Sequence, residues 1–496
     1  MAASVVRTFA LSLLLAVLLS PTPAAAQVVQ VKTVPVAAGD QGLFLPSQTL
    51  GMGNVSLAVD DSLADPWSNP GKGVFVREPA FLGSPTLYTI SGSGGNGRTF
   101  PVAAFLRSGT WFGGFALALQ QIDNTGRDEQ VFFRAWPGQA PRLSDASNRN
   151  LYAQAFVGSR LGDGPWSLGL ALAGASLDAM DGVDLLYANA TAIRQNGTAG
   201  DVRLGLYRQG ERDDLGIVLV HNRVSMTHDV TYLDALWDPW GGNTLPRWRV
   251  DKNEDKTRTW GTQVTWNRSL TAPGWSVGTL LTVNRMSHPK IPNYEIQNIP
   301  RDPGTTWAYE MGMGLSRSRG PTTFGLDVIV QPIWSETWQE AEEDTRVEGD
   351  GSGTIIRKGD RTIENDFFFT NVVLRTGISH DTGPSTTVQA GLELRSYDYT
   401  LDQRNLVESS FRSQDESWME WSPTVGATFR LDDVELRYAG RLTTGTGQPG
   451  IAPTAESRAA ADALALGGFI LAPQGPLTLQ DATVMTHQIS VRIPIR

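Results

Sequence analysis

Apolar and polar residues alternate with a period of two along many short segments of this chain. In the segment 386–396, the residues at alternate positions from Val388 to Leu394 are apolar, and those between them are polar or glycine. The segments 111–119, 434–437 and 489–495 alternate in the same way. Because successive side chains of a strand point to opposite faces, each segment predicts a strand with one apolar and one polar face.

The alternation predicts strands along the whole chain. Many of the candidate runs reach nine residues or more, the length that a tilted strand needs to cross a bilayer. Together the candidate strands predict a barrel of sixteen strands. Fourteen strands is the alternative, because the apolar–polar alternation is weak in the first two candidates, 84–92 and 99–107. The candidate strands are 84–92, 99–107, 110–120, 148–159, 165–175, 198–209, 213–223, 257–269, 274–286, 305–318, 323–336, 365–379, 385–399, 418–430, 433–442 and 483–495.

The connections between these strands fall into two kinds. Every second one is short and carries Gly, Pro, Asp or Ser, the residues that tolerate tight turns. Short periplasmic turns and long external loops are typical of outer-membrane barrels, whereas a soluble sandwich has no reason to segregate its turns. The short connections are 107–109, 161–164, 209–214, 272–274, 319–321, 380–384 and 431–433, and most of the others are long: 121–147, 224–256, 287–304, 337–364, 400–417 and 443–482.

Aromatic residues recur near the strand ends on the apolar face. Trp260 and Trp266 bracket one strand, Trp275 opens the next, and Trp307 and Tyr309 follow farther on. Such positions are typical of the aromatic girdles at the two membrane interfaces. A sheet edge in hydrocarbon would leave backbone groups unpaired at several kcal/mol each, so the sheet must close. We therefore predict an all-β fold: a transmembrane antiparallel β-barrel of 14–16 strands in the cell outer membrane.

The first residues form a processing segment rather than part of the fold. Arg7 precedes an apolar run that is too short to span a membrane, and a small-x-small site ends at Ala26. We expect a signal peptide at 1–26, an N-terminal hatch or plug segment at 27–83 and the barrel at 84–496. The formal net charge of −10 argues against a nucleic-acid partner, and the absence of cysteine suits an exported barrel.

Residues 39–73 differ from the strands in being rich in small residues and turn formers. They resemble the N-terminal hatch of the FadL-type outer-membrane transport superfamily, which moves long-chain fatty acids and other hydrophobic molecules through a plugged fourteen-stranded barrel. The spacing between Asn54 and Asp60 is more similar to that of the PorV-like branch, which serves protein secretion. The hatch and gate residues that the resemblance implies are Gly51, Gly53, Asn54, Asp60, Asp61, Asn69 and Pro70, with Gly71 in place of an alanine.

The C-terminus departs from the usual barrel pattern. Outer-membrane barrels usually end on an aromatic residue that the assembly machinery reads, and that machinery is an expected partner. This chain ends in Ile493-Pro494-Ile495-Arg496, which has the right alternation and a different last residue.

Two further sets of residues are candidates for contact with a ligand. In 224–256, four aromatic residues could receive a hydrophobic molecule, since exposed apolar clusters often mark binding surfaces; packing against neighbouring loops is the alternative. Charges that face lipid would cost a few kcal/mol at mid-bilayer, so charged strand residues should face the lumen, as lining of a wet channel or as a stabilising salt-bridge network. The aromatic set is Tyr232, Trp237, Trp240 and Trp248, and the lumen set is Arg203, Glu310, Asp327, Glu393, Arg395, Glu435, Arg437 and Arg492.

Motifs for enzymatic chemistry are missing from the sequence. Gly92–Gly97 fits GxGxxG by letter, but a strand follows it, so a hairpin loop is the better interpretation. Neither HExxH nor GxSxG occurs, and the five histidines are scattered. The acidic run 340–350 is interpreted as a solvated loop, with a cation or lipopolysaccharide-bridging site as the alternative. Residues 456–466 are rich in Ala and Leu and could form a short helix folded over the mouth, with a plain surface helix as the alternative.

The sequence therefore favours a transport protein rather than an enzyme. The main hypothesis is passive uptake of a small hydrophobic molecule, fatty-acid-like or hydrocarbon, without catalytic residues, metal or cofactor. Membrane lipid and lipopolysaccharide are further expected partners. A PorV-like secretion partner and a general diffusion porin are the alternatives.

Overall fold

The computed structural model describes residues 32–92, 94–123, 148–183, 187, 190–238, 243–288, 303–347, 353–451 and 477–495. Three short helices precede the sheet: η1 (Leu50–Met52), α2 (Asp65–Ser68) and η2 (Pro70–Phe75). No helix within the described ranges has both the length and the apolar character that a membrane-spanning helix requires. Almost all remaining regular structure is strand.

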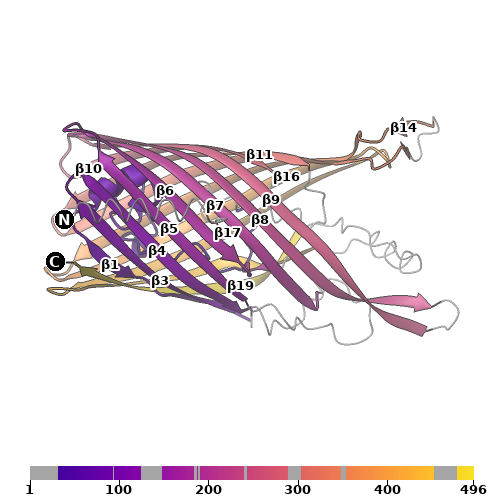
Figure 1. Cartoon of the computed structure of the whole chain (residues 1–496), viewed down its shortest axis with the longest axis horizontal. Coiled ribbons are helices and arrows are strands. Elements are labelled where there is room, and N and C mark those ends of the chain that lie inside the picture. The colour runs from indigo at the N-terminus through magenta and orange to yellow at the C-terminus, as the bar shows by residue number, and fades with distance from the viewer. Residues whose placement is uncertain are drawn as a thin grey trace.

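The strands form one antiparallel sheet that closes on itself, and a two-residue hairpin stands outside it (Figure 1). The sheet strands are β1 (Ala80–Gly83), β2 (Thr86–Ile90), β3 (Asn96–Ser108), β4 (Trp111–Asp123), β5 (Asn148–Arg160), β6 (Trp166–Leu177), β7 (Ala192–Gln209), β8 (Asp213–Asp238), β9 (Asn243–Ser269), β10 (Trp275–Ser287), β11 (Gly304–Arg319), β12 (Thr322–Glu340), β15 (Arg361–Asp381), β16 (Thr386–Asn405), β17 (Ser410–Arg430), β18 (Glu435–Ile451) and β19 (Leu477–Pro494). The separate hairpin is β13 (Thr345–Arg346) and β14 (Ile355–Ile356).

The barrel closes between its first and last strands. β1 and β2 are two parts of one barrel strand, since both pair with β3 on one side and with β19 on the other. The break between them lies at Ser84-Pro85, where proline has no N–H for the ladder. The closed barrel therefore has 16 strands, which confirms the predicted fold class and decides against fourteen.

The two faces of the barrel wall differ in chemistry, as the alternation predicts. On β7, Val202 and Leu204 are 43% and 44% exposed, whereas Asp201 and Arg203 between and beside them are buried. Large apolar side chains are exposed in this way around the barrel, which places lipid outside and polar groups inside. This is an outer-membrane barrel. The exposed set includes Phe100, Val102, Leu117, Leu151, Leu219, Met313, Val328, Val425 and Ile489.

The connections that the sequence predicts to be short all lie at one end of the barrel, as expected. There β19 ends beside the start of β1, with Pro494 opposite Ala80, so the last strand pairs normally although the chain has no terminal aromatic residue. The first strand begins at Ala80, before the expected boundary. Following the usual sidedness of such barrels, we call this the periplasmic end.

At the opposite end, two predicted loops are wrong. β8 and β9 pair from Asp213–Arg268 to Asp238–Asn243, so most of 224–256 is a long hairpin that extends beyond the barrel wall (Figure 1). The segment 400–417 is likewise mostly strand, and only 406–409 connects β16 to β17. The apolar alternation ends where a strand leaves the membrane, but backbone pairing continues, and the sequence pattern therefore ends before the strand does.

The remaining connections are only partly described. Gly92–Gly97 connects β2 to β3 as the expected hairpin, and no helix follows it. Most of 121–147 and 287–304, a part of 337–364 that includes the end of the acidic run, and the proposed helix 456–466 lie outside the described residues.

The outward-facing belt makes a direct prediction about stability. Leu204→Arg places a charge near mid-belt on β7, and we expect it to lower the free energy of unfolding by about 2–4 kcal/mol. The measurement is urea-induced unfolding of the barrel in lipid vesicles. Trp248→Arg is the control, because Trp248 is 64% exposed on the hairpin beyond the belt. An equal loss from both variants would contradict the position of the belt.

Candidate functional site

The N-terminal segment, residues 32–76, lies inside the barrel and touches opposite walls. From β6, the Ser167 hydroxyl donates to Gly71 O at 2.8 Å. From β17, the Thr424 hydroxyl donates to Gly51 O at 3.1 Å. The short helices of this segment are seen within the barrel near its periplasmic end (Figure 1). The segment therefore crosses the interior from one wall to the other.

Rows of glycine in the wall let the N-terminal segment approach closely. Gly158, Gly169 and Gly205 lie directly opposite one another on β5, β6 and β7. Gly325, Gly377 and Gly391 form a second row on β12, β15 and β16. A Cβ on Gly169 would lie 2.3 Å from Pro70 O, and one on Gly377 would lie 2.2 Å from Met52 O. At these glycines the wall has no side chains, so the backbone of the segment packs directly on the backbone of the wall.

The Gly-Met-Gly-Asn part of the motif is a tight turn against the second row. Gly53 and Asn54 have φ angles of 70° and 59°, in the left-handed region that glycine and asparagine adopt most readily. Met52 N and Asn54 N both donate to Thr49 O. A Cβ on Gly51 would lie 2.6 Å from Gly426 Cα, so this glycine is required by proximity to the wall.

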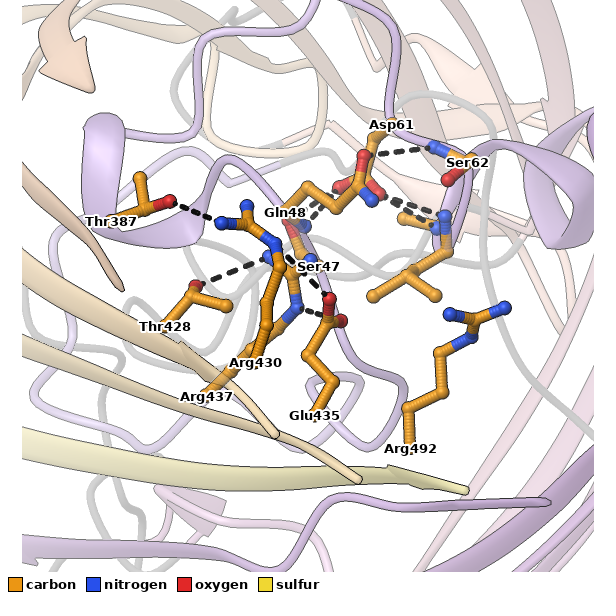
Figure 2. A network of polar contacts seen from close by, with 12 residues as sticks. Ser47, Gln48, Asp61, Ser62, Thr387, Thr428, Arg430, Glu435, Arg437 and Arg492 are labelled. Atoms are coloured by element: carbon orange, nitrogen blue, oxygen red, sulfur yellow. Dashed lines mark hydrogen bonds and ion pairs between the residues drawn. The ribbon is translucent and has the colours of Figure 1, made fainter. Parts of the chain in front are cut away.

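Asp61 organises the middle of the segment (Figure 2). One carboxylate oxygen accepts from the Ser47 hydroxyl and Gln48 N, both at 2.7 Å. The other accepts from Leu63 N at 3.0 Å and Ala64 N at 3.1 Å. Burial raises the pKa of Asp61 above its ordinary value, and the bonds from Ser47, Gln48 and Ala64 oppose that rise. Its neighbour Asp60 has a side chain that is 51% exposed.

The Asn-Pro-Gly turn places η2 against the first glycine row. The Asn69 side chain caps the helix by accepting from Gly71 N at 2.9 Å, and Pro70 occupies the first helical position, where no N–H is needed. A Cβ on Gly71 would lie 2.9 Å from Tyr207 N and 3.0 Å from Gly205 O. That contact is a physical reason for glycine where the family motif has alanine.

The periplasmic end of the segment is anchored by aromatic packing. Trp67 is 2% exposed, with its ring 5.6 Å from that of Phe105 and 4.9 Å from that of Phe156. The Arg107 guanidinium on β3 donates to Val74 O and Val76 O at 3.0 and 2.6 Å. This cluster buries a large apolar area on the β3–β7 side of the lumen.

An ion pair accompanies this anchor. Lys72 Nζ lies 2.7 Å from an Asp65 carboxylate oxygen and 3.9 Å from one of Asp60. Burial opposes the charge on Lys72, but the two carboxylates outweigh it, so the pKa of Lys72 is raised. Asp60 therefore faces a cation within the segment, whereas Asp61 binds backbone and hydroxyl donors.

The opposite wall, β15 to β18, carries charges that face inward. Glu393 bonds Arg375 at 2.8 Å and Arg395 at 3.3 Å. Farther from the periplasmic end, Lys32 pairs with Glu420 at 2.7 Å. These are ion pairs within the lumen, and they favour the interpretation of a salt-bridged lining.

The other candidate lumen residues also lie on the inward face. Glu435 contacts Arg437 at 2.8 Å and Arg430 at 3.6 Å near the periplasmic mouth (Figure 2). The further contacts, each given with its distance, are Arg203 to Asp201 (2.7 Å), Glu310 to Gln331 (2.9 Å), Asp327 to Ser56 N (2.8 Å) and Arg492 to Glu78 (2.7 Å).

The outer part of the lumen holds an aromatic group that the sequence analysis did not identify. Phe367, Phe369 and Tyr399 are buried with centroids 5.4–5.8 Å apart, and Trp418 lies 6.0 Å from Tyr399. Val34 of the N-terminal segment packs among them. The signal was present as aromatic residues on the inward parity of β15 and β16, where a polar face was expected. Together with Met286, Ala308, Ile333 and Leu401, these residues form what we call the outer lumen cluster.

Of the four aromatic residues predicted for an external loop, the two whose side chains are described, Tyr232 and Trp248, do not lie together. Tyr232 lies on β8 opposite Arg249, whose guanidinium is 4.5 Å from the tyrosine ring centroid. Trp248 is the neighbour of Arg249 on β9, so it points to the other face of the hairpin. Trp237 is a strand residue whose side chain is not described, and Trp240 lies outside the described residues.

Comparisons with known proteins add three solved structures. The chain is similar to a Pseudomonas aeruginosa FadL homologue (TM-score 0.44, 10% identity, covering 91% of this chain and 99% of that one). It is also similar to the toluene transporter TbuX of Ralstonia pickettii (TM-score 0.39, 10% identity, covering 94% of this chain and 99% of that one). A third similar structure is the toluene transporter TodX of Pseudomonas putida (TM-score 0.39, 12% identity, covering 94% of this chain and 100% of that one). No protein-family model and no curated protein sequence matches the chain.

The Asp60-Asp61 pair offers a test of the motif with a built-in control. The substitution Asp61→Asn replaces one of the two acceptor oxygens by an NH₂ group. Either the Ser47 and Gln48 donors or the Leu63 and Ala64 donors would then face that group and lose their hydrogen bonds. We expect the free energy of local opening of residues 47–64 to fall by about 1–3 kcal/mol. Hydrogen exchange of these amides measures it. Asp60→Asn should change exchange little, and equal effects would contradict the role assigned to the Asp61 carboxylate.

Gly278 on β10 is a further wall glycine that touches the N-terminal segment, and its contact can be tested separately. A Cβ on Gly278 would lie 1.8 Å from Leu57 O, so Gly278→Ala must push the segment away from the wall, at a cost of about 1–3 kcal/mol. Gly83→Ala is the matched control, because the nearest contact of its Cβ would be an ordinary 3.8 Å. Proteolysis of the N-terminal segment in the intact barrel should accelerate only for Gly278→Ala.

Proposed function

We propose that this barrel takes up small hydrophobic molecules passively, and that the N-terminal segment is its plug and gate. The observation that carries the proposal is the filled lumen: a segment held by hydrogen bonds and glycine contacts crosses the periplasmic end, and an apolar cluster lies beyond it toward the outside. An open water channel would need neither feature. No energy-coupling motif is needed for transport down a gradient.

The outer lumen cluster is the proposed first binding site. It is built from aromatic and aliphatic side chains that face the lumen; its members other than the partly buried Trp418 are at most 3% exposed, and Val34 packs among them. An apolar ligand that displaces Val34 would gain contact with the rings of Phe367, Phe369 and Tyr399. The site would bind hydrocarbon or an acyl chain and would discriminate weakly among apolar molecules.

Two apolar clusters lie on the inner side of the β4–β8 wall, between the outer end of the barrel and the plug. Ile193 and Val230 lie in one buried cluster, and Met226, Ala199 and Tyr152 lie in the next, which includes Phe44 of the N-terminal segment. Buried polar and charged side chains, among them Gln120, Asn150 and Asp201, lie on the same inner wall between these clusters. A hydrophobic ligand would move from one apolar cluster to the next, and the plug must shift for it to pass near Asn69-Pro70.

The plug can be locked to the wall because the native chain has no cysteine. A Cβ on Gly325 would lie 3.3 Å from Val55 Cβ, close to the disulfide spacing of about 3.5–4.5 Å. The test is uptake of a long-chain fatty acid and of an aromatic hydrocarbon into proteoliposomes containing Val55→Cys/Gly325→Cys. We expect oxidation to reduce uptake by about tenfold or more and reduction to restore it. Each single-cysteine variant should transport equally in both redox states.

Three outcomes would overturn parts of this proposal. Uptake by the wild type no faster than into empty vesicles would contradict the transport function. Undiminished uptake by the oxidised double variant would show that the segment is not the gate. Large, steady ion conductance of the wild type in planar bilayers would assign a diffusion porin instead.

The spacing from Asn54 to Asp60 keeps a PorV-like secretion partner as the second candidate. Recovery of a secreted protein's C-terminal domain together with this barrel from detergent extracts, in a strain where uptake is absent, would favour that candidate.

A further inference from the structure

A basic patch lies on the outward face of β8–β10, on the other side of the wall from the lumen. Arg223 on β8 and Arg258 on β9 lie directly opposite each other, and both side chains are exposed on the face that also carries Leu219 and Trp260. Arg285 of β10 lies directly opposite Trp260 of β9, and its side chain is exposed as well. Its guanidinium lies 5.7 Å from the centroid of the Trp307 ring. These cations therefore adjoin the lipid-facing belt.

The position of the patch along the strands places it at the outer membrane boundary. Arg223, Arg258 and Arg285 each lie about ten residues from the periplasmic end of their strands. A tilted strand crosses the hydrocarbon core in about 9–11 residues. Among outward residues, the exposed Leu219 and Leu281 lie nearer the periplasm, and the exposed Lys256 lies farther out. The three guanidinium groups thus stand where the headgroups of the outer leaflet begin.

Two like charges directly opposite on neighbouring strands destabilise a sheet unless an anion lies between them. In the part of the chain that the structure describes, neither Arg223 nor Arg258 takes part in an ion pair. The carboxylate of Glu254, farther along the same face, already pairs with Lys252 and Lys256. The pair therefore lacks the anion that would balance it.

Small neighbours leave room for a bulky anion over the pair. Gly200 of β7 lies beside Arg223, and Ser287 of β10 lies beside Arg258. Farther around the barrel the same cross-strand row becomes acidic, with Glu336 opposite Asp366. A phosphate group would be attracted to the β8–β10 side and repelled from the β12–β15 side.

We propose that Arg223 and Arg258, assisted by Arg285, bind a phosphate of the phosphorylated glycolipid of the outer leaflet, lipopolysaccharide. Its phosphates match the charge and bidentate geometry of guanidinium groups. Its acyl chains would lie on the belt beside Leu219 and Trp260. The site is on the outside of the wall, so it is independent of the proposed uptake path.

The test compares lipid binding to the full-length mature protein in a nonionic detergent, measured by native mass spectrometry with bis-phosphorylated lipid A. We expect Arg223→Gln/Arg258→Gln to weaken binding by about tenfold or more, as loss of charge-assisted hydrogen bonds to phosphate predicts. The matched control is Arg268→Gln/Arg317→Gln, which removes two exposed arginines from the periplasmic end of β9 and β11. That variant should bind as the wild type does.

The other arms separate the phosphate from its carrier. Lipid A without phosphates should bind equally to the wild type and to Arg223→Gln/Arg258→Gln. Phosphatidylglycerol that binds as tightly as lipid A, with the same loss in the variant, would overturn the proposal in favour of general attraction to anionic lipid. Equal binding of lipid A by all variants would also overturn it. Heat-modifiable gel migration checks folding, and Arg258→Gln alone replaces the double variant if that variant does not fold; uptake should be unchanged in either.

Discussion

Closure of the backbone hydrogen-bond ladder is the constraint on which this structure depends. In hydrocarbon no water can satisfy a free N–H or C=O group, so the sheet must pair its first strand with its last. Here that seam is made by a strand in two parts, β1 and β2, with Pro85 at the break. The seam is also tied to the interior, because Ser84 and Thr86 donate from their hydroxyls to Phe44 O and Leu43 O.

Once the wall is closed, the interior must be filled or left wet, and this chain fills its periplasmic end. Glycine rows remove side chains from the wall where the N-terminal segment crosses, so backbone packs on backbone. The segment is then fixed by donors and acceptors from many strands rather than by one strong contact. Such distributed contacts, each weak in net terms, allow a segment to be held firmly and still be displaced in steps.

Charge is placed by the same logic on both faces of the wall. Inside, Glu393 lies between Arg375 and Arg395, and Lys32 meets Glu420, so these charges are paired, whereas the buried carboxylates of Asp61 and Asp327 accept hydrogen bonds. Outside, charge is kept off the belt and begins at its outer edge, with Arg223 and Arg258. The cost of burying charge in lipid thus governs where charged residues lie, and among the described residues Arg223 and Arg258, which form no ion pair, lie at the outer edge of the belt.

The sequence by itself determined the strands, their facing and the turn asymmetry, because period-two alternation and turn residues are local properties of the chain. It also located the Gly51–Gly71 motif, including the glycine that replaces alanine at position 71. Only the tertiary structure decided that 224–256 is a paired hairpin, that Tyr232 and Trp248 face apart, and that Phe367, Phe369 and Tyr399 meet around Val34. Those facts depend on which strand lies next to which, and on how far pairing continues beyond the bilayer. Cross-strand neighbours are distant in sequence, so no local pattern records them.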